Sequence, residues 1–354
     1  MDILALIHLA AEKGASDIHI VASAPPVFRI NGILQQVADM APLTNEEIEQ
    51  ALTQLTGDKE RADFERDMEL DFSYSVPDLC RLRINAAKQR GTISLVIRLI
   101  KGQIPTIDEL GLPMLCKELI LRPRGLIVVT GPTGSGKSTT LSAMINYLNN
   151  IEYRRLVTIE DPVEFVYTDN KCTITQRELG SDTHSFTEAL RHVLRQNPDV
   201  VLVGEMRDAD TAGAVLSVAE TGHLVLTTGH APSASQAVER IIDLFPPYER
   251  PLVQSRLASL LIGILCQVLV PKADGSGRVA AVEVMLATPA ARNCIREGKI
   301  FQLPNVMLTQ ARLGMVLLDQ ALVNLYRSGA ITRDSLFAFC NDQEEVGKLI
   351  GGVH

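Results

Sequence analysis

The first hundred residues contain short apolar runs, one with helical spacing and the others with strand-like character. Turn-forming pairs separate the runs, among them Asn31-Gly32, Pro77-Asp78 and Arg90-Gly91. Together they predict a small α/β domain over residues 1–100. Its predicted elements are a helix over Ile3–Lys13, strands over Asp17–Val21, Val27–Ile30 and Ile33–Val37, an acidic helix capped by Thr44, and strands over Asp71–Val76, Cys80–Ala86 and Thr92–Leu99.

From Arg124 onward, short apolar strands alternate with helical stretches, which is typical of a parallel sheet with crossover helices. Before them, the polar segment KGQIPTIDELGLP at residues 101–113 predicts a linker. After Ala290 the pattern is mostly helical and includes Gly314–Ser328. We therefore predict an α/β core over residues 114–289 and a C-terminal helical region over residues 290–354. The predicted core strands are Leu126–Thr130, Leu156–Glu160, Val200–Gly204 and Leu224–Thr227.

Residues 131–138 read GPTGSGKS and fill the pattern G-x-x-x-x-G-K-[ST] of phosphate-binding loops. In such a loop the backbone N–H groups of residues 134–136 face phosphate oxygens, Lys137 reaches the β- and γ-phosphates, and the Ser138 hydroxyl ligates Mg²⁺. The strand before the loop and the helix after it favour this function over an accidental glycine-rich turn. The predicted nucleotide-binding residues are Gly131, Thr133, Gly134, Ser135, Gly136, Lys137, Ser138 and Thr139.

Two acidic motifs follow apolar strands, as a phosphate loop requires. The first is TIEDPVE over residues 158–164, and the second is VVLVGEMRD over residues 200–208, which ends its strand at Gly204-Glu205. One carboxylate there can hold Mg²⁺ and another can position the attacking water. Taken alone, Glu160 and Asp161 could instead form a capped turn before Pro162.

Composition narrows the class of protein. The chain has 354 residues, a formal net charge of −8, no Trp and 4% aromatic residues, so it lacks the basic and stacking surfaces of most nucleic-acid binders. Its six cysteines form no CxxC pair, so the sequence indicates neither a zinc site nor a disulfide framework. Scattered cysteines of this kind are typical of a protein in a reducing compartment. The most apolar segment, Leu257–Val270, is too short to span a bilayer, so we expect a cytoplasmic protein.

A series of further motifs extends over nearly the whole chain. It includes ASDIHI, DFSYSVPDLCRLRIN, RGLIVVTGPTGSGKSTTL, TIEDPVEFV, QRELG, ALRHVLRQNPDVVLVGEMRD, AETGHLV, AARNCIRE and LGMVLLD. With this series the chain resembles the type II/IV secretion ATPase superfamily, and most closely its PilT-type pilus retraction motors. The resemblance implies a PAS-like N-terminal domain, a RecA-like ATPase core, and a homohexamer with ATP at its interfaces.

The resemblance also assigns roles to individual residues. TIEDPVE matches the family's Asp box and puts Glu160 in the position of the carboxylate that activates water, while Glu205 falls in the Walker B motif and would organise the metal with Ser138. Arg83 and Arg98 match the pair of arginines that reach the phosphates in the family, where they would stabilise transferred charge. Without the resemblance, strand arginines are more often solvated or paired with surface acids.

Two histidines fall in the family's His box, His223 in ETGHLV and His230 in TTGHAPSAS. Either could also be an ordinary packed or hydrogen-bonded histidine. The segment departs from the family pattern, because Gly229 and Ala231 replace the usual Leu before and Thr after the second His. Because of this departure, the resemblance supports γ-phosphate sensing by this loop less strongly than it supports the phosphate loop.

The C-terminal motif AARNCIRE, residues 290–297, is close to an element associated with retraction motors. Arg292, Ile295 and Arg296 lie at i, i+3 and i+4, so on a helix they would form one face. We expect this face to couple hydrolysis to movement, with a helix that merely packs on the core as the competing interpretation. The chain also lacks the long N-terminal region and the four-cysteine zinc insertion of extension motors and type II secretion ATPases.

The sequence thus predicts a Mg²⁺-dependent hexameric ATPase that retracts type IV pili. Its expected partners are an inner-membrane pilus platform protein and a related accessory ATPase. We expect it to act at the cytoplasmic face of the inner membrane. No nucleic acid is expected. Two alternatives stay open at this point: a RecA-like nucleic-acid motor, and an accessory subunit that binds nucleotide but hydrolyses it weakly.

Overall fold

The computed structural model describes residues 1–30, 32–37, 40–77, 79–100 and 103–351. The chain divides into two compact units, one made of Met1–Gln103 with Glu164–Val166 and the other of Ile104–Val163 with Tyr167–His354. Parts of the predicted turns at Asn31-Gly32 and Pro77-Asp78, and the start of the predicted linker, lie outside the described residues.

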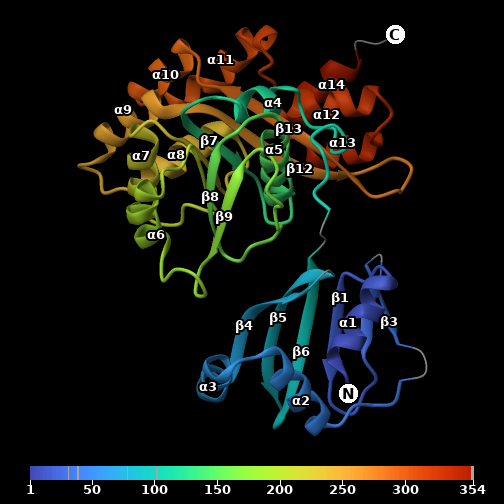
Figure 1. The fold of residues 1–354 in the computed structure, drawn as a ribbon. Coiled ribbons are helices and arrows are strands. Elements are labelled where there is room, and N and C mark those ends of the chain that lie inside the picture. Colours follow the sequence, from blue (N-terminus) through green and yellow to red (C-terminus); the bar gives the residue numbers. More distant parts are fainter. Residues whose placement is uncertain (31, 38–39, 78, 101–102, 352–354) are drawn as a thin grey trace. The chain divides into compact units, whose positions relative to one another are not determined.

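The smaller unit is an antiparallel sheet in the order β3-β2-β1-β6-β5-β4, packed with three helices (Figure 1). Alternate residues of β5 and β6 point into its core, among them Leu82, Ile84, Leu95 and Ile97, which are fully buried. The predicted strands are all present, within three residues at each end. The elements are α1 (Ile3–Glu12), β1 (Asp17–Val21), β2 (Val27–Ile30), β3 (Ile33–Gln36), α2 (Asn45–Leu55), α3 (Asp58–Asp67), β4 (Glu69–Val76), β5 (Cys80–Gln89) and β6 (Thr92–Ile100).

The larger unit contains a seven-stranded sheet in the order β13-β12-β7-β11-β10-β8-β9. Its elements begin with α4 (Leu115–Ile120), β7 (Gly125–Thr130), α5 (Lys137–Ile151), β8 (Arg155–Glu160), β9 (Thr173–Glu178), α6 (Phe186–Val193), η1 (Leu194–Gln196), β10 (Val200–Val203), α7 (Ala209–Glu220) and β11 (Leu224–Thr228). They continue with α8 (Ala234–Asp243), α9 (Arg250–Leu260), β12 (Leu261–Pro271), β13 (Arg278–Leu286), α10 (Pro289–Arg296), η2 (Ile300–Gln302), α11 (Leu303–Thr309), η3 (Ala311–Leu313), α12 (Leu318–Arg327), α13 (Arg333–Phe339) and α14 (Gln343–Gly351).

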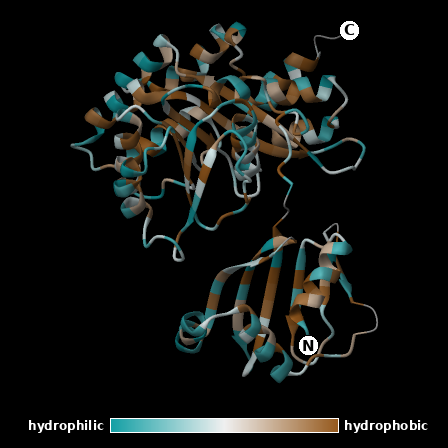
Figure 2. Cartoon of the chain, in the orientation of Figure 1, coloured by the Kyte–Doolittle hydropathy of each residue, from teal (hydrophilic) through white to brown (hydrophobic). Residues whose placement is uncertain are grey.

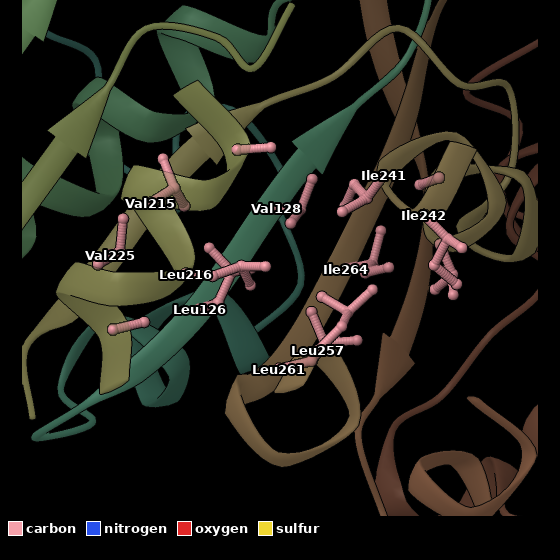
Figure 3. Packing of buried hydrophobic residues seen from close by; sticks show 14 of the residues in the cluster. Leu126, Val128, Val215, Leu216, Val225, Ile241, Ile242, Leu257, Leu261 and Ile264 are labelled. Carbon is pink, nitrogen blue, oxygen red and sulfur yellow. The ribbon is translucent and has the colours of Figure 1, made fainter. Parts of the chain in front are cut away.

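Helices cover both faces of this sheet. Alternate residues of β7 separate the two cores: Leu126 and Val128 pack with α7, α8 and α9, whereas Ile127 and Val129 pack with α4 and α5. Figure 3 shows the first of these cores around Leu126 and Val128. Figure 2 shows hydrophobic residues along the strands, as expected for strands buried on both faces. The predicted α/β class is confirmed.

The sheet is parallel except for β13, which pairs antiparallel with β12. The sequence analysis did not predict β9, β12 or β13. The apolar run Leu257–Val270 contains the end of α9 and most of β12. Because its apolar residues are buried or half-buried on both faces of the strand, its hydrophobic pattern does not separate helix from strand. Of the helices that the structure describes, none has the length and apolar character needed to cross a bilayer.

The C-terminal helices α12, α13 and α14 pack on the β12–β13 hairpin. The predicted helix at Gly314–Ser328 begins later than expected, at Leu318, because Val316 pairs with Val284 in an isolated bridge. Glu283, which is 4% exposed, then accepts hydrogen bonds from the backbone N–H groups of Leu318 and Ala234. This carboxylate therefore joins the N-terminal ends of α8 and α12, and its burial raises its pKa.

Candidate functional site

The loop at residues 131–138 connects the end of β7 to the start of α5, at the carboxyl edge of the parallel sheet. Gly134 and Gly136 have φ values of 78° and 87°, which residues with a side chain rarely adopt. A Cβ at Gly131 would lie 2.2 Å from the carbonyl oxygen of Gln267. The loop therefore needs glycine at these positions, as the motif predicts.

Two polar side chains inside the loop fit a phosphate ligand. The Lys137 ammonium donates to the carbonyls of Gly131 and Pro132 at 2.9 and 3.1 Å, so a cation lies within the loop. The Ser135 hydroxyl is buried and has no hydrogen-bond partner among the described residues. Such a group is costly to bury unless a ligand or water completes it.

Helix α5 adds the electrostatics of its N-terminus. Its N-cap is Gly136, which provides no side-chain cap, and the first turn contains no acidic residue. The uncapped N–H groups and the helix dipole both favour an anion at this end. Ser138 and Thr139 are half-buried in this first turn, whereas Thr133 is exposed on the loop. The predicted phosphate-binding residues thus share one end of one helix.

The two acidic motifs lie on adjacent strands at the same edge. Val203 of β10 pairs in parallel with Ile159 of β8, so Glu160 and Gly204-Glu205 follow neighbouring strand positions. Glu160 is 8% exposed and accepts hydrogen bonds from the Thr158 hydroxyl at 2.6 Å and the Gln176 amide at 3.2 Å. These two donors fix the orientation of the carboxylate, and neither was predicted from the sequence.

Glu205 belongs to a small charged cluster. Its carboxylate pairs with Arg207, and the resulting hydrogen bond raises the pKa of that guanidinium. His230 Nε2 lies 3.3 Å from Glu205 Oε2, so the structure brings this histidine to the acidic edge. Within the described ranges, no group of three His, Cys, Asp or Glu side chains could hold a metal. A Mg²⁺ ion here would thus depend on Ser138, few carboxylates and phosphate oxygens, which is its usual coordination beside nucleotides.

The His-box loop packs tightly against the end of β7. The Ala231 backbone exchanges two hydrogen bonds with the Thr130 hydroxyl, at 2.7 and 2.9 Å, and Ala231 is 1% exposed. A Cβ at Gly229 would lie 3.2 Å from the same hydroxyl oxygen. The two departures from the family pattern are therefore small residues at a crowded contact.

His223 lies at the other end of the sheet. Its carbonyl accepts from Gly125 N–H at the amino end of β7, whereas the phosphate loop follows the carboxyl end. A six-residue strand separates the two ends by roughly 20 Å. Its Nδ1 lies 2.9 Å from the Thr221 hydroxyl and 3.1 Å from the Val218 carbonyl. Within one chain, His223 is not part of the cluster around Glu205.

Arg83 and Arg98 are on the smaller unit. They are direct cross-strand partners on β5 and β6, and both are exposed. Arg98 Nε donates to Asp17 Oδ1 at 2.8 Å. Burial raises the pKa of Asp17, but hydrogen bonds from Arg98 and Ser16 outweigh it and the pKa lies below its usual value. The two guanidiniums thus occupy one face of one sheet.

The C-terminal residues differ in exposure, and this corrects the predicted surface face. Ile295 is completely buried in the core that includes α9, so it is not exposed. Arg292 donates to the Ala258 and Leu261 carbonyls at 2.7 and 2.8 Å. These hydrogen bonds satisfy backbone carbonyl groups at the C-terminal end of α9. Arg296 is exposed. The competing interpretation, that α10 packs on the core, therefore holds for Arg292 and Ile295.

Gln267 on β12 is a site residue that the motifs did not reveal. It is 1% exposed, and its amide nitrogen donates to the Ser135 carbonyl of the phosphate loop while its amide oxygen accepts from the Thr140 hydroxyl of α5. The signal in the sequence was a single amide side chain that interrupts the apolar run Leu257–Val270.

Comparison with known proteins agrees with this geometry. The family described as "Type II/IV secretion system protein" matches residues 2–328. The type IV pilus retraction ATPase PilT of Pseudomonas aeruginosa is 45% identical over 335 residues, which cover 95% of this chain and 97% of that protein. The type IV pilus ATPase PilU of the same organism is 40% identical and covers 99% of this chain and 91% of its own length.

Among solved structures, the pilus retraction motor PilT with bound ADP superposes with a TM-score of 0.92 at 41% identity, covering 98% of this chain and 99% of that one. The ATPase DotB of Legionella pneumophila superposes with a TM-score of 0.78 at 27% identity, covering 95% and 94%. The family match, the relatives and the solved structures each cover residues of both units. The chain belongs to the type II/IV secretion system proteins and, within them, to the PilT-like nucleotide-binding ATPases.

Proposed function

We propose that this chain is the ATPase subunit of a motor that retracts type IV pili. The observation that carries the proposal is a phosphate loop with Glu160 and Glu205 at one edge of a parallel sheet. This arrangement occurs in a chain that matches the retraction ATPase PilT along nearly its whole length. The first support is the local chemistry of the site, and the second is similarity along the rest of the chain.

Each residue at this edge has a proposed role in ATP hydrolysis. Lys137 and the loop N–H groups bind the phosphates, while Ser138 and Glu205 hold Mg²⁺, which when bound neutralises phosphate charge. Glu160, oriented by Thr158 and Gln176, positions the attacking water. His230 senses the occupied site through Glu205, whereas we assign His223 to the amino end of β11.

We assign the remaining positive charge at the transferred phosphate to Arg83 and Arg98. We propose a homohexamer in which these two arginines of one subunit reach the phosphates bound by its neighbour. An arginine at the transferred phosphoryl group stabilises the charge that develops there. The ring would act at the cytoplasmic face of the inner membrane, on the pilus platform protein and beside a related accessory ATPase.

Deletion of the gene tests the cellular function. Loss of a retraction motor leaves cells with excess surface pili and no twitching motility, and the wild-type gene restores both. The Lys137→Ala gene serves as the matched control, because it produces a folded chain without turnover. Normal pilus number and motility in the deletion strain would contradict the proposal. ATPase stimulation by DNA or RNA would instead support the nucleic-acid motor.

A further inference from the structure

The side chain of Gln267 lies directly behind the phosphate loop. Its Nε2 donates to the carbonyl oxygen of Ser135, and its Oε1 accepts from the Thr140 hydroxyl at 2.8 Å. A Cβ at Gly136 would lie 3.1 Å from the same Nε2. The amide therefore fills the space between β12, the loop and the first turns of α5.

The chemistry of its partners fixes how this amide is turned. A backbone carbonyl can only accept a hydrogen bond, so the nitrogen of Gln267 must face Ser135. The Thr140 hydroxyl can then donate to the remaining oxygen, which satisfies both groups. Because Gln267 is 1% exposed, water does not replace either contact at low cost.

This orientation has a consequence on the other side of the peptide. The Ser135–Gly136 peptide is trans, so its C=O and N–H groups point in opposite directions. When Gln267 holds the Ser135 carbonyl outward, the Gly136 N–H is turned toward the inside of the loop. Gly136 has no side chain to resist a peptide flip, so the contact from Gln267 restrains this peptide from outside the loop.

We propose that Gln267 is a positioning residue that keeps the Gly136 N–H aimed at bound phosphate by holding the Ser135 carbonyl. The inference rests on the proposed nucleotide-binding function of the loop and adds a residue from a different strand to it. Gln267 does not contact the reacting atoms itself. Its effect is on the affinity for nucleotide, through the geometry of one peptide group.

The test compares two variants of the full-length protein with ADP as the ligand. Gln267→Met keeps the length and approximate volume of the side chain but removes both hydrogen bonds. Its Kd for ADP should rise about tenfold, the equivalent of one hydrogen bond. The control is Ile264→Val on the same strand, which is fully buried in the core on the opposite face of the sheet. It should lower the melting temperature and leave the Kd unchanged.

A merely structural role predicts a different result. In that case Gln267→Met and Ile264→Val would both lower the melting temperature, and neither would alter the Kd for ADP, which would overturn the inference. If Gln267→Met does not fold, Gln267→Leu provides the second test, because it also removes the hydrogen bond to the Ser135 carbonyl but has a different apolar shape. Gln267→Leu should raise the Kd for ADP by a similar factor, and a folded Gln267→Leu protein with wild-type affinity would equally contradict the proposal.

The wild-type measurement separates this inference from the proposed function. Wild-type protein that binds ADP, together with a Gln267→Met variant that binds it equally well, overturns only the positioning role. Wild-type protein that does not bind ADP overturns the proposed function itself. The kinetic counterpart is a rise in KM for ATP that exceeds any fall in kcat, because the contact acts on ground state and transition state alike.

Discussion

The two units present their functional residues in opposite ways. In the larger unit Lys137 and Glu160 are 9% and 8% exposed, and neighbouring side chains or carbonyls fix their positions. In the smaller unit the side chain of Arg98 is 65% exposed and Arg83 lies beside it on an open sheet face. The proposed phosphate-binding residues therefore all belong to the larger unit, whereas the proposed arginine finger residues belong to the smaller one. This difference leads us to expect that nucleotide binding depends on the larger unit and that ATP turnover depends on both units.

The largest effect should come from the phosphate loop itself. Lys137→Ala removes the cation held within the loop, so both ATP binding and turnover should be lost. ATP hydrolysis and nucleotide affinity measured on the purified variant check this, with the melting temperature as the control for folding. Turnover above a tenth of the wild-type rate would contradict the assignment of the loop.

The arginines should separate binding from turnover. Arg83→Ala or Arg98→Ala should leave the Kd for ADP nearly unchanged but reduce ATP turnover by about 10³- to 10⁵-fold, the range of arginine fingers. Because Arg98 is bonded to buried Asp17, Asp17→Asn is the control for loss of that ion pair. Equal loss of nucleotide binding and ATP turnover would contradict the claim that the arginines of the smaller unit act on turnover alone.

Glu160 belongs to the same unit as the phosphate loop but should affect turnover only. Glu160→Gln keeps the shape of the side chain and removes the charge that orients water, so kcat should fall about 10²- to 10⁴-fold. The Kd for ADP should stay within about twofold, because no direct phosphate contact is assigned to Glu160. An equal loss of affinity would show that this carboxylate organises the binding site.

The C-terminal residues give the smallest and most local effects. Ile295→Ala should lower the free energy of unfolding by about 2–5 kcal/mol, because it leaves a cavity in the core. Arg296→Ala should change it by less than about 0.5 kcal/mol. If Arg296 couples hydrolysis to movement, its variant will hydrolyse ATP normally but fail to restore retraction in cells. Twitching motility restored by the Arg296→Ala gene would contradict a role of Arg296 in coupling hydrolysis to movement.

The sequence located the phosphate loop and the two acidic motifs at the ends of strands, because each motif is contiguous. The phosphate loop needs glycine, lysine and serine at adjacent positions, and the acids follow strands that are visible as short apolar runs. The strands of the smaller unit were also predicted, since their alternation survives in an antiparallel sheet with one buried face.

The contacts between distant segments were not predicted. Gln267, Gln176 and Thr130 reach the site only because β12, β9 and β7 meet in one sheet, and no local pattern reports that pairing. The β12–β13 hairpin itself was missed, because strands buried on both faces lose the alternation that identifies them. The burial of Ile295 was missed for a different reason: helical spacing places it on one face with Arg292 and Arg296, and only the packing of α10 on α9 shows that this position faces the core.

The most direct test of the separation between binding and turnover is complementation between two inactive variants. Lys137→Ala subunits lack a working loop but keep their arginines, and Arg83→Ala subunits have the reverse defect. After subunit exchange, an equal mixture should recover about a quarter of wild-type turnover, since one interface in four combines an intact loop with an intact arginine in a random head-to-tail ring. A mixture no more active than either variant alone would contradict the account.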